Sequence, residues 1–231
     1  MEKYLILDMG KVLVGPTTGS WLITPVLLEN IDVSKIDKEK MNAAMKKCSY
    51  ILNDKAETLE EEYKILRHFY ASLFEEAGYD IGDDIIDLIT SDFVYNDTDT
   101  KYFVYDDVKE ELERLSKEYT LLVLSDNWPC GDEYLKKHDL FKYFTKTYMS
   151  SVYGVTKSDG TLFDYPIKDF NIQNGDAIFV DDKEKLLDIA TTKGLDVMLM
   201  DRDDSAKNSK YKVIKSLRDI KPRELMEHEE K

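Results

Sequence analysis

Four short apolar runs along the chain predict buried β-strands. Each run is continuous, without alternation of apolar and polar residues, and each stops at polar residues. Such runs are typical of strands that are covered on both faces of a parallel sheet. The four runs are Lys3–Asp8, Tyr119–Ser125, Asp176–Asp182 and Asp196–Asp201.

Helical patterns lie between these runs. Val108–Ser116 precedes the second run and Lys183–Lys193 follows the third, with Gly194 placed to end that helix. Alternating strands and helices predict an α/β fold with a doubly wound parallel sheet.

The segment 16–105 breaks this alternation, because it contains helical patterns and no convincing buried strand. In Leu59–Ala77, apolar residues recur at spacings of three and four, which predicts an amphipathic helix, and Ile81–Ile89 resembles another. We therefore expect a core domain formed by residues 1–15 and 106–220, a helical insertion at 16–105 and a charged C-terminal tail at 221–231.

Composition narrows the function. The 231 residues are 42% hydrophobic and carry a net charge of −15, so the chain can bury a core but lacks the basic excess that nucleic-acid binding requires. An anionic substrate must therefore meet a locally positive pocket. Two cysteines, Cys48 and Cys130, are too few for a disulfide framework, and no apolar run is long enough to span a membrane. We expect a cytoplasmic protein, either a monomer or a homodimer, with a small-molecule substrate and neither a nucleic acid nor a membrane as partner.

Candidate chemistry lies where the predicted strands end. Functional groups of an open parallel sheet gather at the carboxyl ends of its strands, and here three runs end in Asp8, Ser125 and Asp181–Asp182. Any one of these is typical of a turn or a helix cap. Their joint occurrence predicts a functional site.

Four segments resemble the ordered motifs of the haloacid dehalogenase-like (HAD) hydrolases, and the insertion matches the place and helical character of that family's cap. The resemblance implies a Rossmann-like core with an inserted helical cap. The first segment has the form Asp-x-Gly-x-Val, which is similar to that of some sugar-phosphate phosphatases. The segments are Leu7-Asp8-Met9-Gly10-Lys11-Val12-Leu13, Leu124-Ser125-Asp126-Asn127, Gly154-Val155-Thr156-Lys157 and Phe179-Val180-Asp181-Asp182.

This resemblance implies that Asp8 attacks phosphorus to form an aspartyl-phosphate, which water then hydrolyses. Ser125 would hold a phosphoryl oxygen, and the Lys157 ammonium would sit between the phosphate and Asp8 as a point charge. Three further candidates for phosphate or substrate contacts follow the strand ends, although a lysine there can also point to solvent: Lys11, Asp126 and Asn127.

Three carboxylates in a small volume repel one another unless a cation lies between them, and oxygen ligands beside a phosphate favour Mg²⁺. By resemblance, Asp8 and Asp182 would bind the metal directly, the Gly10 carbonyl would be a third ligand, and Asp181 would act directly or through water. The alternative is that the Asp181–Asp182 pair only caps the following helix.

Family phosphatases usually carry a second aspartate two residues after the nucleophile, where this chain has Gly10. That aspartate is a general acid and base, a role typically worth about 10²–10⁴-fold in rate. A leaving group of low pKa, such as the anomeric oxygen of a sugar 1-phosphate, would suit a site without it.

The sequence therefore predicts a Mg²⁺-dependent phosphohydrolase that acts on a small phosphomonoester, with sugar phosphates as candidates. Two alternatives stay open at this point. One is a metal-independent dehalogenase with the same nucleophile, and the other is a non-catalytic phosphate-binding relative.

Overall fold

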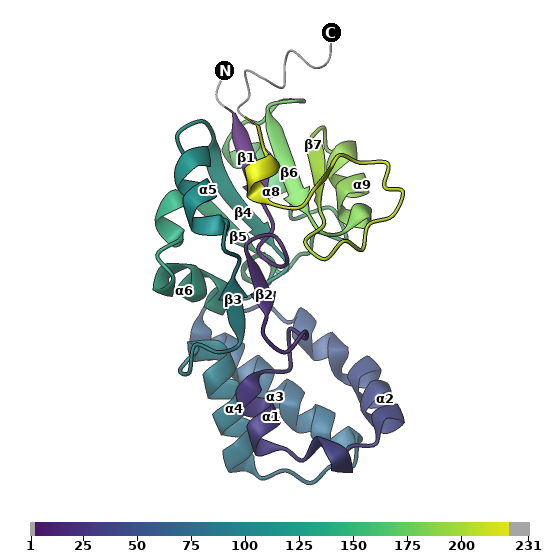
Figure 1. The fold of residues 1–231 in the computed structure, drawn as a ribbon. Helices are drawn as coiled ribbons and strands as arrows, with labels where there is room; N and C mark the ends of the chain where they lie inside the picture. Colours follow the sequence, from purple (N-terminus) through teal and green to yellow (C-terminus); the bar gives the residue numbers. More distant parts are fainter. Residues whose placement is uncertain (1–2, 222–231) are drawn as a thin grey trace.

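The computed structural model describes residues 3–221, which form a six-stranded parallel sheet and a separate group of helices beyond the carboxyl ends of its strands (Figure 1). The strand order is β5-β4-β1-β6-β7-β8. The strands are β1 (Tyr4–Leu7), β4 (Thr120–Ser125), β5 (Lys146–Met149), β6 (Ala177–Asp181), β7 (Asp196–Met200) and β8 (Val213–Ile214).

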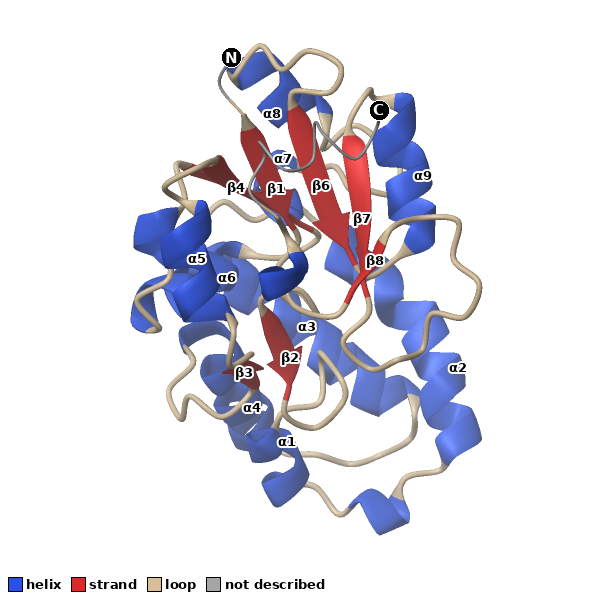
Figure 2. Ribbon diagram, turned by 45° about the horizontal axis from the view of Figure 1, so that its top comes forward, coloured by secondary structure: helices blue, strands red, loops and turns tan. Residues whose placement is uncertain are grey.

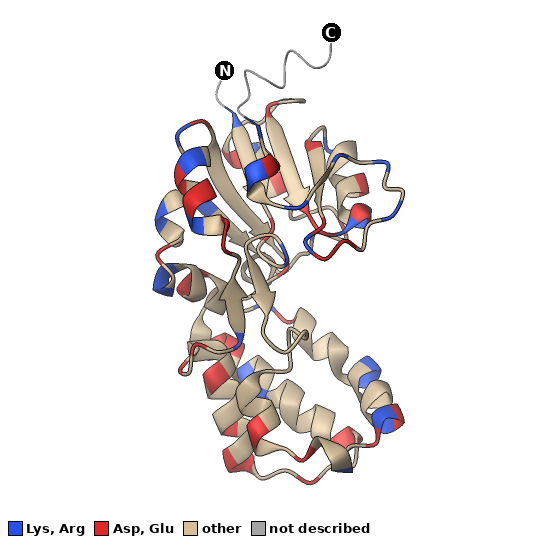
Figure 3. Cartoon of the chain, viewed as in Figure 1, with Lys and Arg blue, Asp and Glu red and all other residues tan. Residues whose placement is uncertain are grey.

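The sheet is buried on both faces, which explains why its central strands are apolar throughout. Leu5 and Leu7 of β1 pack into one hydrophobic cluster with helices α5 and α6, whereas Tyr4 and Ile6 pack into a second with α8 and α9. Figure 3 shows that charged residues lie mainly on helices and loops, and that the strands carry few of them. The helices of this part are α5 (Val108–Leu115), α6 (Pro129–Lys137), α7 (Ser150–Tyr153), α8 (Asp164–Asp169) and α9 (Glu184–Thr192), with the 3₁₀ helices η3 (Phe141–Tyr143) and η4 (Leu217–Asp219).

The predicted α/β class and doubly wound sheet are confirmed. All four predicted strands occur, as β1, β4, β6 and β7, but the sequence pattern did not reveal β5 or β8. These two strands form the edges of the sheet, where β5 begins with polar residues and β8 has only two residues. An edge strand needs no continuous apolar run, because only part of it is covered.

The insertion is mainly helical and lies beyond the sheet (Figure 2). Its helices share a hydrophobic cluster, which Cys130 of α6 also joins. Its longest helix, α3, begins at a capping box. The Thr58 side chain accepts a hydrogen bond from the Glu61 backbone N–H, and the Glu61 side chain accepts one from the Thr58 backbone N–H. The apolar face of α3 packs on α4 and α2. The helices are α1 (Pro25–Asn30), α2 (Lys38–Cys48), α3 (Leu59–Glu76) and α4 (Asp83–Tyr95), with the 3₁₀ helices η1 (Val33–Lys35) and η2 (Ser49–Asn53).

Two short antiparallel strands connect the insertion to the sheet, namely β2 (Val14–Pro16) and β3 (Tyr102–Val104). The expectation that the segment 16–105 holds no convincing buried strand is consistent with β3, in which Tyr102 is buried but Phe103 is exposed. A three-residue strand is too short to show a period, so the apolar pattern could not reveal it. The paired strands bring the chain into and out of the insertion at the same place, and the predicted boundaries near residues 15 and 106 stay a prediction.

No helix within residues 3–221 combines the length and the apolar character that crossing a bilayer requires. Both cysteines are buried and free. Of the predicted charged tail, only Lys221 lies within the described residues.

Candidate active site

Three neighbouring strands deliver the predicted site residues to the same edge of the sheet. β1 lies between β4 and β6, and Leu7 is in register with both Val123 and Val180. The next residue, Asp8, donates its backbone N–H to the Val180 carbonyl at 3.0 Å. Parallel pairing therefore aligns the three strand ends, since parallel strands point their carboxyl ends the same way.

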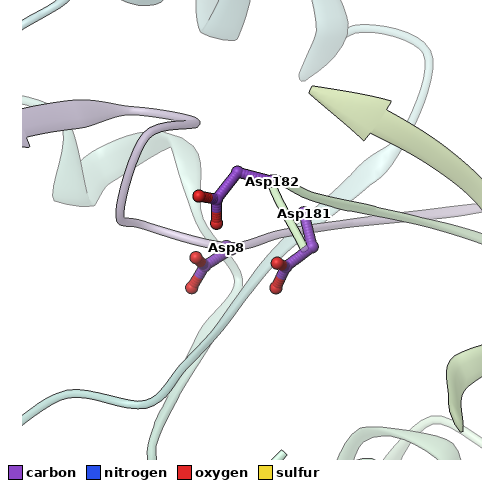
Figure 4. A group of neighbouring side chains, drawn as sticks. All are labelled: Asp8, Asp181 and Asp182. Atoms are coloured by element: carbon purple, nitrogen blue, oxygen red, sulfur yellow. The ribbon is translucent and has the colours of Figure 1, made fainter. Parts of the chain in front are cut away.

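Asp8, Asp181 and Asp182 converge, each offering a carboxylate oxygen, and these oxygens all lie within 4.8 Å of one another (Figure 4). Asp8 and Asp181 are buried, and Asp182 is half-buried. Burial raises the pKa of both Asp181 and Asp182, and the negative charge of Asp8 raises each of them further. The cluster is thus short of positive charge.

Lys157 supplies the cation of this cluster. Its ammonium lies 2.8 Å from Asp8 Oδ1 and donates a 2.6 Å hydrogen bond to Asp181 Oδ2. The contact with Asp8 is an ion pair without hydrogen-bond geometry, because Asp8 Oδ1 is buried and accepts no hydrogen bond. Burial opposes the charged ammonium, yet the surrounding carboxylates, Asp8 and Asp181 foremost, outweigh it and raise the pKa of Lys157.

Local backbone geometry explains why this lysine reaches the cluster. The short helix α7 ends at Tyr153 and is capped by Gly154, whose left-handed φ of 66° turns the chain back toward the strand ends. The Lys157 backbone N–H then donates to Asp126 Oδ1 at 2.9 Å. Asp126 therefore orients the lysine loop, a contact that the sequence did not predict.

Ser125 is the last residue of β4, Asp126 and Asn127 follow it, and all three line the pocket that contains Asp8. Ser125 is buried. The Asn127 side chain donates to the Met9 sulfur at 3.2 Å and accepts from the Trp128 backbone at 2.8 Å, which fixes its orientation. Desolvation of its carboxyl group raises the pKa of Asp126, although the residue as a whole is exposed.

The loop after Asp8 is a single tight turn. The backbone N–H groups of Leu13 and Val14 both donate to the Met9 carbonyl, at 2.9 and 3.0 Å. Gly10 sits in this turn with a φ outside the left-handed region, so the backbone itself tolerates a side chain there. An added Cβ would lie 3.1 and 3.3 Å from two carbons of the Trp21 indole and 3.7 Å from Asp8 Oδ2. That the Gly10 carbonyl binds a metal stays a prediction.

Lys11 is the one predicted phosphate contact that the structure places elsewhere. Its backbone is left-handed, with a φ of 56°, and its ammonium forms an ion pair with Asp203 at 3.2 Å. Both side chains of this pair are exposed to solvent. It does not line the pocket that contains Asp8.

The pocket has a volume of about 250 Å³ and two unlike sides. The side formed by the loops that follow the strands carries the polar groups described above together with Lys183, which the sequence signals only through its place beside Asp182. The opposite side is mainly aromatic and belongs largely to the insertion, and its residues had no motif to signal them. They are Trp21, Leu22, Phe93 and Tyr102, with Trp128 at their border.

Charge in this pocket is not positive, contrary to what an anionic substrate needs. Its lining contains three carboxylates, on Asp8, Asp126 and Asp182, against the two ammonium groups of Lys157 and Lys183. Among the described residues, no hydrogen bond or ion pair engages the Asp182 carboxylate. Oxygen donors that are partly unpaired and crowded fit a divalent cation.

Comparisons with known proteins identify the fold. No protein-family model and no curated protein sequence matches the chain. Many solved structures match, and three of them illustrate the range. They are the HAD-hydrolase YfnB from Bacillus subtilis bound to magnesium (TM-score 0.63, 16% identity, 94% of this chain and 96% of that one), the HAD phosphatase from Thermococcus onnurineus (0.62, 17%, 97% and 97%) and the L-2-haloacid dehalogenase from Xanthobacter autotrophicus (0.66, 13%, 98% and 99%). At these identities the likeness shows a shared fold.

Proposed function

We propose that this chain, whose fold is that of the haloacid dehalogenase-like hydrolases, is a member of that superfamily and hydrolyses a small phosphomonoester with the help of Mg²⁺. The observation that carries the proposal is the position of Asp8. It lies within 4.8 Å of two further carboxylates and 2.8 Å from a buried ammonium. A nucleophilic carboxylate, a metal site and a phosphate-neutralising lysine need this arrangement.

In the proposed reaction, a carboxylate oxygen of Asp8 attacks phosphorus and the ester oxygen departs with the bonding electron pair. The Lys157 ammonium stands beside Asp8 and offsets negative charge on the transferring phosphoryl group. Ser125 and the backbone of the loop after β4 hold phosphoryl oxygens. Water then attacks the aspartyl-phosphate, which yields inorganic phosphate and restores the Asp8 carboxylate.

The donor set fits Mg²⁺. Asp8 and Asp182 would bind it, with Asp181 acting directly or through water, and Lys157 already neutralises part of Asp181. Bound there, the metal would supply Lewis-acid stabilisation of the phosphoryl oxygens and would reverse the negative balance of the pocket lining.

A metal-independent dehalogenase is the second candidate. The apolar side of the pocket favours it, because this side carries no charged residue that could donate a proton and a haloalkanoate releases its halide without one. The carboxylate cluster opposes it, because a dehalogenase would hold Asp182 beside its nucleophile without a counter-ion and would leave one cation, Lys157, to be shared by Asp8 and Asp181.

The deciding assay measures phosphate release from p-nitrophenyl phosphate and a panel of sugar phosphates, with Mg²⁺ or with a chelator, and halide release from 2-chloropropionate. We expect phosphate release that requires Mg²⁺ and is abolished in Asp8→Asn. Asp164→Asn is the matched control, because Asp164 pairs with Lys193 on the surface of α8 and should leave activity unchanged. Chelator-resistant halide release without phosphate release would establish the dehalogenase instead, and phosphate binding without any turnover would indicate a non-catalytic relative.

A further inference from the structure

The space beside the nucleophile is bounded by an aromatic ring where a side chain at position 10 would stand. A Cβ on Gly10 would point between Asp8 Oδ2, 3.7 Å away, and the Trp21 indole, 3.1 Å away. Carbon atoms pack at about 3.5–4.0 Å, so the indole already occupies part of the space that such a side chain needs. Trp21 is held there by an edge-on contact with Tyr102, with ring centroids 5.4 Å apart.

The rest of this side offers no acid to a departing oxygen. The pocket residues from the segment 16–105 are Trp21, Leu22, Phe93 and Tyr102, and none of them is charged. The single hydroxyl among them is the phenol of Tyr102, and burial raises its pKa far above the usual range. Tyr102 is therefore a poor proton donor, and the three carboxylates that line the pocket follow strands of the sheet and do not belong to the insertion.

The same side also offers little to a polyhydroxylated substrate. A hydroxyl buried without a partner costs about 1–3 kcal/mol, so each sugar hydroxyl placed against these side chains weakens binding. A planar apolar group gains instead, because aromatic rings pair favourably in stacked or edge-on contacts.

The missing proton donor and the apolar aromatic residues both favour the same class of ester. We propose that the pocket selects aryl phosphates, whose alcohol is planar, apolar and released as a stabilised anion, and that Trp21 is the residue that selects them. This inference rests on the proposed phosphohydrolase function.

Hydrolysis of an aryl phosphate at this site needs no proton donor for the leaving group. As the Asp8 oxygen bonds to phosphorus, the bond from phosphorus to the aryl oxygen breaks and its electron pair leaves on the aryloxide. Resonance in the ring stabilises this anion, whereas an alkoxide would need protonation. Water next attacks the aspartyl-phosphate, and its two protons remain on the released dihydrogen phosphate as the Asp8 carboxylate re-forms.

The test compares five substrates with full-length protein and Mg²⁺. Phenyl phosphate has both a ring and a stabilised anion, benzyl phosphate has only the ring, and glucose 1-phosphate and glucose 6-phosphate have hydroxyls in place of a ring. Acetyl phosphate has a leaving group that needs no proton and lacks a ring, so it reports the reaction of Asp8 independently of the aromatic side. We expect kcat/KM for phenyl phosphate to exceed that of each glucose phosphate and that of benzyl phosphate by about 10²-fold or more.

Variants at Trp21 separate selection from chemistry. Trp21→Ala should raise KM for phenyl phosphate about tenfold and leave acetyl phosphate turnover unchanged within about twofold, and Trp21→Phe should restore most of the affinity. Tyr50→Ala is the matched control, because Tyr50 is a 65% exposed aromatic residue of η2 that does not line the pocket.

Two results would overturn the inference and spare the proposed function. One is Asp8-dependent turnover of either glucose phosphate at or above the rate with phenyl phosphate, and the other is an equal loss of phenyl and acetyl phosphate turnover in Trp21→Ala. Absence of Asp8-dependent phosphate release from all five substrates would overturn the proposed function, and the aryl phosphate class with it.

Discussion

Replacing Gly10 by aspartate would put a carboxyl group two residues after Asp8, where it could protonate a leaving alcohol. The new Cβ would approach the Trp21 indole to 3.1 and 3.3 Å, roughly half an ångström inside normal packing. Overpacking of a rigid core costs about 1–3 kcal/mol. Trp21 is 37% exposed and can give way, so we expect a cost of about 1 kcal/mol.

The rate effect depends on whether the indole leaves room for the carboxyl group. A positioned general acid is worth about 10²–10⁴-fold, and benzyl phosphate, whose alkoxide needs a proton, should show this gain most clearly. We expect a small gain in Gly10→Asp alone, no gain in Trp21→Ala alone, and about 10²-fold in the double variant. Coupling between the two substitutions should therefore exceed about 1 kcal/mol, as for residues in contact.

The assay is kcat/KM for benzyl phosphate in the four proteins of this cycle, together with their thermal midpoints. Gly10→Ala is the matched control, because it adds the same Cβ beside Trp21 without an acid. If Gly10→Asp alone reaches the rate of the double variant, Trp21 does not exclude the acid. If no variant gains on benzyl phosphate while phenyl phosphate is still turned over, Gly10 is not the reason for poor alkyl ester turnover.

Three more expectations concern charge. Lys157→Met should lower kcat/KM by about 10²-fold or more and should destabilise the protein by about 3–5 kcal/mol in urea unfolding, because it leaves buried aspartates unpaired. Lys193→Met should change neither quantity, and wild-type kinetics in Lys157→Met would contradict the role of Lys157. Asp182→Asn should raise the Mg²⁺ concentration for half-maximal activity by tenfold or more, and an unchanged Mg²⁺ titration would remove it from the metal site. Burial raises the pKa of Glu62 from 4.5 to about 7, so the folded state prefers the protonated acid, and the free energy of unfolding should fall by about 3 kcal/mol as pH rises from 4.5 through 7. Glu62→Gln should flatten that slope and exposed Glu60→Gln should not; equal slopes in wild type and Glu62→Gln would refute the shift.

The sheet could be predicted from the sequence because central parallel strands are covered twice. Their continuous apolar runs mark both the strand and its end, so Asp8, Ser125 and Asp181 could be assigned to one edge before any coordinates were known. Lys157 was predicted through the resemblance, and the ion pairs explain its place physically.

The direction of the Lys11 side chain could not be predicted from the sequence. Its place in sequence, three residues after the nucleophile, suggests a phosphate contact, but a left-handed φ of 56° turns it toward Asp203, which is 192 residues away in the chain. The aromatic side of the pocket was missed for a related reason. Trp21 and Phe93 belong to different parts of the insertion, and only tertiary packing brings them over Asp8.

Lys101 explains why this aromatic side can be selective. A lysine just before a short strand is expected to be solvated, yet Lys101 is only 2% exposed. Its ammonium lies 4.5 Å from the centre of the Phe93 ring and 5.0 Å from that of Tyr102, and it also donates to the Phe93 carbonyl. A buried cation that contacts the rings of Phe93 and Tyr102 at once holds both in one orientation. The rings are therefore fixed before a substrate arrives, which reduces the entropy lost on binding and makes a poorly matched alcohol costly to accommodate.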